Sequence, residues 1–222
     1  MKRKIFSLLF VTGLLTMNSC KDALDYTPKG VLSSSDLTSP TAVEGLVTAA
    51  YAAIGNGDMI GPIYSNWVYG SVRSDDAYKG GGGTGDVGEI DAIEHYNLVT
   101  PSINSFVTRT WQNLFKSISR CNVALRAVNS LSEASYPNKK TRLAELRFLR
   151  AHSYFTMKLL YKNIPIFDEN ASAEEILKVS NSLSNEESWN KIAADFQFAI
   201  DNLPSSQPEL GRANKVAAQA YL

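Results

Sequence analysis

Apolar residues recur at helical spacing along most of this 222-residue chain, and polar stretches separate them. The first such stretch covers residues 39–55, where Ser39 can cap a helix, Pro40 fits its first turn and Gly55 can end it. Its apolar positions fall on one stripe, formed by Val43, Leu46, Val47, Ala50 and Ile54. The pattern predicts an amphipathic helix with one buried face.

Two longer helices are expected next. Residues of about 103–130 carry apolar side chains at intervals of three and four, namely Ile103, Val107, Trp111, Leu114, Ile118, Cys121 and Leu125. Residues of about 138–162 are apolar on nearly all sides, and Asn163 and Pro165 follow them. We therefore expect this helix to be covered on more than one face, with Phe155 in the core.

The C-terminal part of the sequence predicts two more helices. Ser184 and Glu187 form a capping-box pattern at the start of a helix of about 184–203. A last helix is expected from near Arg212 to Leu222. The stretches "ESWNKIAADFQFAIDNLP" and "RANKVAAQAYL" resemble tetratricopeptide units, which are helix pairs with small residues where the helices approach closely.

Residues 56–102 break this pattern. They lack a helical period and hold nine glycines, so we expect a long irregular insertion, which is usually functional or disordered. The sequence as a whole predicts an all-α fold of tetratricopeptide-like helical hairpins with one irregular, glycine-rich insertion.

Charge and cysteine content narrow the possible functions. Lys plus Arg and Asp plus Glu both number 22, so nothing indicates binding to nucleic acid, whose partners concentrate positive charge. Cys121 lies in a helical pattern and is expected to be a buried small hydrophobe without a disulfide partner.

The first residues have the pattern of a lipoprotein signal. "MKRK" is basic, and the largely apolar run of 13 residues that follows is too short to span a bilayer core of about 30 Å as a helix. Ser19 precedes Cys20, whose thiol can accept a lipid in bacterial lipoproteins. We expect a signal peptide at 1–19, lipidation (diacylglycerol, palmitate-type chains) at Cys20 and a tether at 20–38. The alternative is an ordinary signal peptide cut elsewhere, with Cys20 a bystander.

Several motifs that suggest chemistry lack the context they need. "GTGDVG" (83–88) has dinucleotide-binding spacing, but no apolar strand precedes it. His95 and His152 lie far apart, which makes a shared metal site unfavourable. Four acidic residues could supply oxygens to Ca²⁺, yet they do not have EF-hand spacing and favour a solvated loop instead: Asp86, Glu89, Asp91 and Glu94.

An enzyme is not indicated either. The sequence has no G-x-S-x-G and no useful Cys/His pair, and neighbouring carboxylates such as Asp75 and Asp76 usually point apart. We expect no catalytic residue, no cofactor and no resident metal.

The best candidate for ligand contact is "NWVYGSVRSDDAYKGGGG", residues 66–83. Aromatic faces can stack on sugar rings, and charged groups can bond hydroxyls, although the same mixture also suits a protein–protein rim or a mobile surface loop. The candidate ligand-binding residues are Trp67, Tyr69, Arg73, Asp75, Asp76, Tyr78 and Lys79.

The helix of about 138–162 carries seven basic residues against Glu145 alone: Lys139, Lys140, Arg142, Arg147, Arg150, Lys158 and Lys162. We expect the Arg stems to pack along apolar neighbours and their heads to pair with other helices, rather than to form an anion site.

That helix also carries a family resemblance. "AELRFLRAHSYFTMKLLYKNIPIF" (144–167) resembles the signature helix of SusD/RagB proteins. The matching positions are Glu145, Arg147, Phe148, Leu149, Arg150, Ala151, Tyr154, Phe155, Tyr161 and Pro165. "CKDALDYTPKG" is similar to the start of these proteins, and "RSDDAYKGGG" also looks like a family segment, so the resemblance covers residues 20–222.

The resemblance implies a lipid-anchored outer-membrane protein, facing outward, that binds glycan or peptide nutrients. Such proteins cover a TonB-dependent SusC-like transporter, and Lys21 with Asp22 resembles their export signal. Family members are usually much longer, so we expect residues 39–222 to be the N-terminal helical-repeat region of a chain truncated at its C-terminus. Two other functions remain open: a helical-repeat scaffold lipoprotein that binds only protein, and a surface glycan hydrolase.

Overall fold

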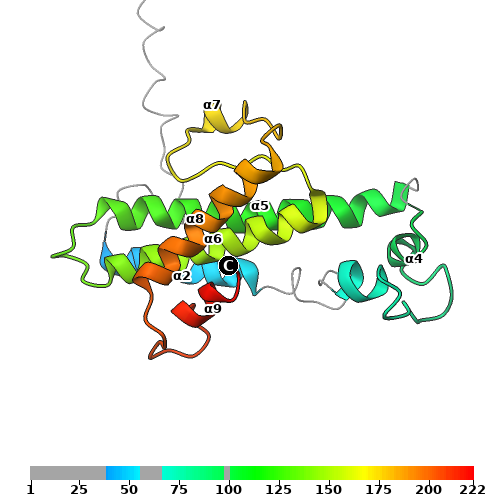
Figure 1. Ribbon diagram of the computed structural model, residues 1–222, viewed down its shortest axis with the longest axis horizontal. Helices are drawn as coiled ribbons and strands as arrows, with labels where there is room; N and C mark the ends of the chain where they lie inside the picture. The colour runs from blue at the N-terminus through cyan, green and yellow to red at the C-terminus, as the bar shows by residue number, and fades with distance from the viewer. Residues whose placement is uncertain (1–38, 56–66, 98–100) are drawn as a thin grey trace, which may run out of the picture. The chain divides into compact units, whose positions relative to one another are not determined.

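Eight helical segments make up the part of the chain that the computed structural model describes, residues 39–55, 67–97 and 101–222 (Figure 1). No strand occurs among these residues. They belong to a unit that begins at Thr38. The expected signal peptide, Cys20 and the tether lie outside the described residues.

The segments are α2 (Pro40–Ile54), the π-helix η3 (Val68–Val72), α4 (Gly88–Glu94), α5 (Pro101–Ser130), α6 (Lys139–Tyr161), α7 (Ala173–Ile176), α8 (Asn185–Asn202) and α9 (Lys215–Gln219). The all-α prediction is confirmed. None of the described helices combines the length and hydropathy that a membrane crossing requires.

Local capping signals in the sequence set several boundaries. The Ser39 hydroxyl accepts a hydrogen bond from the Ala42 amide at the start of α2, and Gly55 follows its end. At α8, Ser184 and Glu187 form the expected capping box, in which each side chain accepts a hydrogen bond from the other residue's backbone N–H. These helices therefore begin and end where their own residues satisfy the exposed backbone groups.

Helix α6 lies at the centre of the packing, between α5, α8 and α2 (Figure 1). Eleven of its residues are buried, which confirms that it is covered on more than one face. Ala144 is fully buried against Ala199, Ala213 and Ala218, which come from α8 and the chain after it. Small side chains at these contacts allow the helices to approach closely, as in tetratricopeptide pairs.

The expectation that residues 56–102 are irregular is wrong in part. Among the described residues of this region, η3 and α4 are helical, and α5 begins at Pro101. Buried Val68 and Val72 of η3 pack with buried Ile90 of α4, a pairing that local periodicity does not reveal because a turn-rich stretch separates them.

The C-terminal prediction also needs correction. The last helix spans only Lys215–Gln219. Asn214 caps it through the Ala217 amide, whereas Arg212 is held by ion pairs to Glu145 and Glu209 and stays outside it. A further helix that the apolar pattern does not predict is α7, a single turn with its own capping box from Ser172 and Glu175.

The predicted core is mostly correct. Cys121 is fully buried, and burial raises the pKa of its thiol to about 12. Phe155 is only partly buried, contrary to expectation, because it lines a cavity of about 350 Å³ together with Tyr69 and Tyr221. Phe196 of α8, which belongs to the same hydrophobic cluster as Phe155, is fully buried at 1% exposure.

Candidate functional site

Residues 67–97, here called the aromatic segment, are anchored on the first half of α5. Val68 and Val72 point inward and join Ile90 and Ile93 of α4 around Phe106 of α5. The short π-helix η3 begins directly after Trp67. π-Helical turns are rare and occur often at functional sites. The anchoring leaves the turns between η3 and α4 at the surface.

The three aromatic candidates of this segment differ in exposure. Tyr78 is 72% exposed and Trp67 is 37% exposed. Tyr69 is half-buried: its ring packs on Phe106 with 5.5 Å between ring centroids, and its hydroxyl donates to Thr110 Oγ1 at 3.3 Å. Burial raises the pKa of Tyr69. Tyr69 therefore fixes η3 to α5, while Trp67 and Tyr78 offer faces to solvent.

Arg73 rests on Tyr96, which is not among the candidate residues predicted from the sequence. Its guanidinium carbon lies 5.3 Å from the centroid of the Tyr96 ring, and the Tyr96 hydroxyl donates to the Arg73 carbonyl at 2.6 Å. No acidic group among the described residues forms an ion pair with Arg73. Tyr96 follows the end of α4, and only the fold brings it back to Arg73.

Lys79 closes the glycine-rich turn. Its ammonium donates to the carbonyls of Gly83 and Asp86, and the Asp86 carboxylate accepts from the Gly82 amide at 2.9 Å. At Gly81, φ is +80°, and an added Cβ would collide with the Asp86 carboxylate. The run of glycines is thus a defined turn, and the positive φ at Gly81 favours glycine there.

The two adjacent acids have different local roles. The Asp76 carboxylate accepts from the Ser74 hydroxyl at 3.0 Å, while Asp75 is exposed with φ of 65°. Val87 and Tyr96 also have positive φ, so the aromatic segment contains three of the four non-glycine residues with positive φ in the described part of the chain. Such backbone conformations cost free energy and cluster at ligand sites.

The acidic residues after the glycines do not act together. The Asp86 carboxylate accepts a hydrogen bond from the Gly82 amide within the turn. Asp91 and Glu94 form a group with His95 in which the possible metal-ligand atoms lie within 4.8 Å of one another. These three residues are the ones that could hold a metal ion in the described chain. His95 Nδ1 lies 2.9 Å from the Asp91 carbonyl, and exposed clusters of this kind are common without a metal.

"GTGDVG" (83–88) does not have the structural context of a dinucleotide-binding site, as the sequence predicts. It forms turns before the seven-residue α4, and no strand precedes it within the described residues. It therefore lacks the strand–turn–helix context of a dinucleotide site.

A second concave feature lies in the helical body, which we define as α2, α5, α6, α8 and α9 with the chain that joins them. It is a cavity of about 590 Å³ between α6, residues 166–171 and α8, and we call it the charge-lined cavity. Its polar walls include Arg147 and Arg150 from α6, Glu169 from the connecting chain, and Lys191 and Asp195 from α8.

The floor of this cavity is a fully paired charge network. Arg150, 4% exposed, donates to both carboxylate oxygens of Asp195 at 2.7 and 2.9 Å, to Asn122 at 2.8 Å and to Glu169. Burial alone raises the pKa of Glu169, but the Arg150 charge and hydrogen bond outweigh it and leave the pKa below its ordinary value. The prediction that basic heads of this helix pair with other elements is confirmed here.

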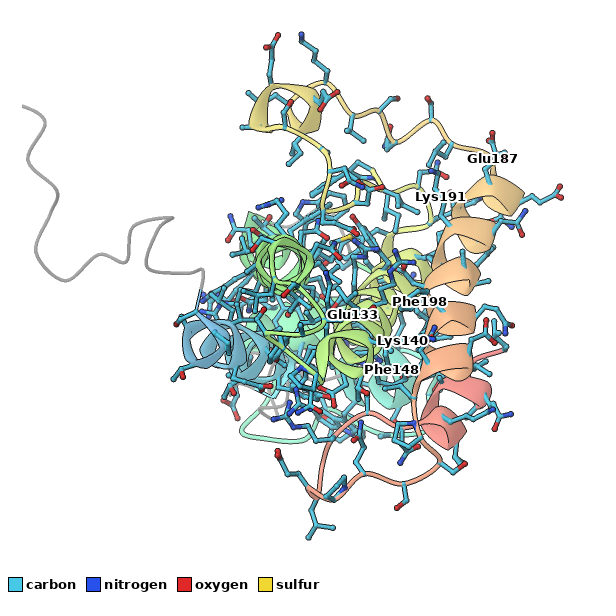
Figure 2. All side chains as sticks on the ribbon, turned by 90° about the vertical axis from the view of Figure 1, so that its left-hand side faces the viewer. Glu133, Lys140, Phe148, Glu187, Lys191 and Phe198 are labelled. Atoms are coloured by element: carbon cyan, nitrogen blue, oxygen red, sulfur yellow. The ribbon has the colours of Figure 1, made fainter. Side chains whose placement is uncertain are left out.

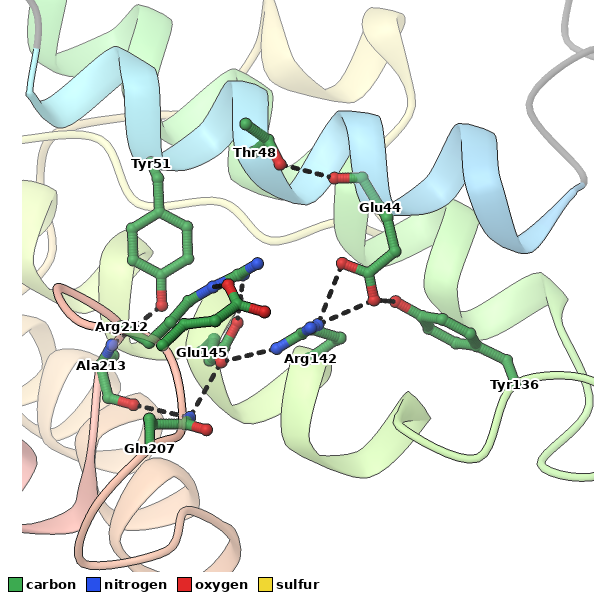
Figure 3. Close-up of polar contacts among 10 residues, drawn as sticks. Glu44, Thr48, Tyr51, Tyr136, Arg142, Glu145, Gln207, Arg212 and Ala213 are labelled. Atoms are coloured by element: carbon green, nitrogen blue, oxygen red, sulfur yellow. Dashed lines mark hydrogen bonds and ion pairs between the residues drawn. The ribbon is translucent and has the colours of Figure 1, made fainter.

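A second network joins α2, α6 and the chain before α9 (Figure 3). Arg142 donates to Glu44 of α2 at 2.9 Å and to Glu145 at 3.0 Å. Arg212 pairs with Glu145 at 3.1 Å, and Gln207 donates to the same carboxylate at 2.9 Å. Burial raises the pKa of Glu145, although Arg142 and Arg212 oppose that shift. These bonds fix the helices against one another.

Comparison with known proteins adds a family. The profile of a SusD-like family, described as starch-binding and associating with the outer membrane, matches residues 33–222. A SusD-like protein (P2) of Formosa agariphila is 28% identical over 222 residues, which cover 99% of this chain and 42% of that protein. A SusD-like protein of Bacteroides ovatus is 25% identical over 230 residues, and the match covers 100% of this chain and 38% of that protein. The chain thus spans about two fifths of the length of these relatives.

Solved structures agree in fold. Surface glycan-binding protein A from Bacteroides fluxus matches with a TM-score of 0.66 and 25% identity over 81% of this chain and 38% of that protein. A laminarin-binding SusD-like protein matches with a TM-score of 0.63 and 21% identity, over 83% of this chain and 39% of that one.

Proposed function

The chain belongs to the SusD-like family, and on this basis we propose that it is a non-enzymatic surface lipoprotein that captures glycans for uptake. The observation that carries the proposal is the aromatic segment, in which exposed stacking faces lie next to hydrogen-bonding groups on a well-anchored turn. The similar proteins are described as glycan-binding or starch-binding, and none of the names given above describes an enzyme. A peptide nutrient is the other ligand class that this surface could take.

We assign ligand contact to Trp67, Arg73 and Tyr78 first, because Trp67 and Tyr78 are exposed and Arg73 has no ion pair with a described residue. Aromatic rings gain free energy by covering the apolar faces of sugars, and a guanidinium can donate to two hydroxyls at once. Asp75, Asp76 and Lys79 supply further polar groups, and Tyr69 holds η3 in place. Tyr96 joins the set because Arg73 rests on its ring.

The proposed partner is a TonB-dependent SusC-like transporter that receives the glycan. The proposed anchor is a lipid on Cys20, which would hold the protein at the outer membrane with its body facing outward. Acyl chains contribute about 0.8 kcal/mol per buried methylene, so several chains together give firm attachment. The family description of association with the outer membrane supports this placement.

The glycan assignment is tested by calorimetry with the full chain and laminarihexaose, starch oligosaccharides and a mixed peptide digest. Trp67→Ala with Tyr78→Ala should weaken binding of the glycan that the wild type binds by about tenfold or more, because two stacking faces are lost. Leu177→Ala with Leu210→Ala is the matched control, since both residues are highly exposed elsewhere. Unchanged affinity in the first variant, with its fold intact by circular dichroism, contradicts the assignment.

The anchor is tested separately. Cys20→Ala should release the protein from membranes into the soluble fraction. Cys121→Ala is the control, because Cys121 is buried and cannot be lipidated in the folded protein. A Cys20→Ala protein that stays on membranes in high salt rules out the lipid anchor.

A further inference from the structure

We propose that the charge-lined cavity is a second binding site, which takes one sugar residue or another neutral polyhydroxy group of that size. Its volume of about 590 Å³ falls within the range of about 300–1,000 Å³ that is usual for small-molecule sites. No residue of the aromatic segment lines it. The proposal therefore stands apart from the function proposed above.

The first argument is that one cation of this cavity, Arg147, is held in position by long ion pairs and a ring contact but donates no side-chain hydrogen bond to a described residue. The Arg147 guanidinium lies over the Phe198 ring at 4.1 Å, which fixes its plane. Its nearest carboxylate oxygens, on Glu169 and Asp195, are each 3.9 Å away, beyond hydrogen-bond length. Both carboxylates are already held by Arg150, so the N–H donors of Arg147, which is one-third exposed, stay open toward the cavity.

The second argument concerns the cavity wall that α8 contributes. Figure 2 shows Lys191 and Phe198 on the side of α8 that faces α6, whereas Glu187 points away from it. Lys191 is exposed and forms no ion pair with a described residue. Arg147 from α6 and Lys191 from α8 therefore present donors from two walls of one cavity.

The third argument selects the chemistry of the ligand. The charged side chains of the cavity are three basic, Arg147, Arg150 and Lys191, and four acidic, Asp168, Glu169, Glu175 and Asp195. The acidic excess disfavours a strongly charged anion such as phosphate. Hydroxyl groups both donate and accept, so they suit open donors on Arg147 and Lys191 beside the carboxylate of exposed Asp168. A neutral sugar fits this mixture.

The test is an NMR titration of the full chain with glucose and, separately, with inorganic phosphate. Glucose should shift the Arg147 Nε–H signal and the amide signals of Asn170 and Lys191 in a saturable way. Ala194→Phe places a ring at the cavity mouth without removing any charged group, since Ala194 is an exposed lining residue. Gln197→Phe is its control, because Gln197 is exposed on the same helix but does not line the cavity.

The expected result is that Ala194→Phe abolishes the glucose shifts and that Gln197→Phe retains them. Arg147→Lys keeps the charge but loses the planar fork, so it should weaken glucose binding by about tenfold, the loss expected for one hydrogen bond to a charged group. Saturable shifts with phosphate alone, no shifts with either probe, or equal shifts in wild type and Ala194→Phe each overturn the proposal. Trp67→Ala with Tyr78→Ala should leave these shifts unchanged, so this site and the proposed aromatic site can fail independently.

Discussion

Two arginines show how differently the helical body and the aromatic segment use charge. Arg150 is 4% exposed and satisfied by two carboxylates and an amide from three other parts of the chain. Arg73 lies on a tyrosine ring near the surface and has no acidic partner among the described residues. Arg150 thus holds parts of the body together, whereas Arg73 has no ion pair among the described residues that a ligand would have to replace.

The aromatic residues repeat this contrast. In the body, Phe196 and Tyr221 stack with ring centroids 4.4 Å apart, and Phe196 is fully buried. In the segment, Tyr78 is mostly exposed. Substitution of Arg150 or Phe196 should therefore lower the free energy of unfolding, and substitution of Arg73 or Tyr78 should change stability little.

The largest expected effect comes from Arg150→Ala. It leaves Glu169 and Asp195 buried with only the more distant Arg147, 3.9 Å from each, to balance their charge, which should lower the free energy of unfolding by about 3–5 kcal/mol. Arg73→Ala is the matched variant and should change stability by no more than about 0.5 kcal/mol. Urea unfolding followed by circular dichroism measures both. Similar losses in the two variants would remove the distinction between the regions.

A smaller effect is expected for Phe155→Ala. Because Phe155 is partly buried and lines a cavity, its loss should cost less than the about 3–5 kcal/mol that is typical of a fully buried phenylalanine. Phe196→Ala should fall within that range, and Tyr78→Ala should stay within about 0.5 kcal/mol. The same unfolding assay ranks the three variants, and a cost for Tyr78→Ala equal to that for Phe196→Ala contradicts the exposure of Tyr78.

The smallest effect is a difference in pH dependence. The folded state lowers the pKa of Glu169 from its ordinary value of 4.5, so this ion pair stabilises the protein above pH 4.5 and stops doing so as the pH falls through the folded-state pKa. Wild type should lose stability more steeply than Glu169→Gln between about pH 5 and pH 3. Thermal unfolding across this range provides the slopes, and parallel slopes would mean that Glu169 does not carry the effect.

The sequence predicts best those structural features that depend on contacts between residues close together in the chain. Ser39, Gly55 and the Ser184–Glu187 pair mark helix ends through bonds to residues within a turn, so the boundaries of α2 and α8 are predictable. The sequence pattern places the start of α9 too early, near Arg212, because Arg212 pairs with Glu145, which lies 67 positions earlier in the chain. The Asn214 cap was a local signal that could have corrected it.

The candidate site divides in the same way. The composition of residues 66–83 identifies Trp67, Arg73 and Tyr78, which the structure places near or at the surface. It cannot separate Tyr69 from them, because the inward bond to Thr110 spans 41 positions. It also misses Tyr96, since the end of α4 meets Arg73 only after folding. The sequence also does not reveal that Arg147 has donors open to the charge-lined cavity. That conclusion depends on knowing that Arg150 already binds Glu169 and Asp195, which only the structure shows.

The glycine turn that Lys79 closes has a consequence for how tightly this surface can bind. Four consecutive glycines have more conformational entropy to lose than any other sequence of that length. Two hydrogen bonds donated by the Lys79 ammonium, and one that the Asp86 carboxylate accepts from Gly82, hold them in a single shape. A ligand that takes over the two Lys79 donors that bond the Gly83 and Asp86 carbonyls removes those two bonds and returns entropy to the turn. The affinity that such a ligand gains from Lys79 is therefore a difference between two competing uses of the same two donors, and the order of the turn is thermodynamically linked to occupancy of the site.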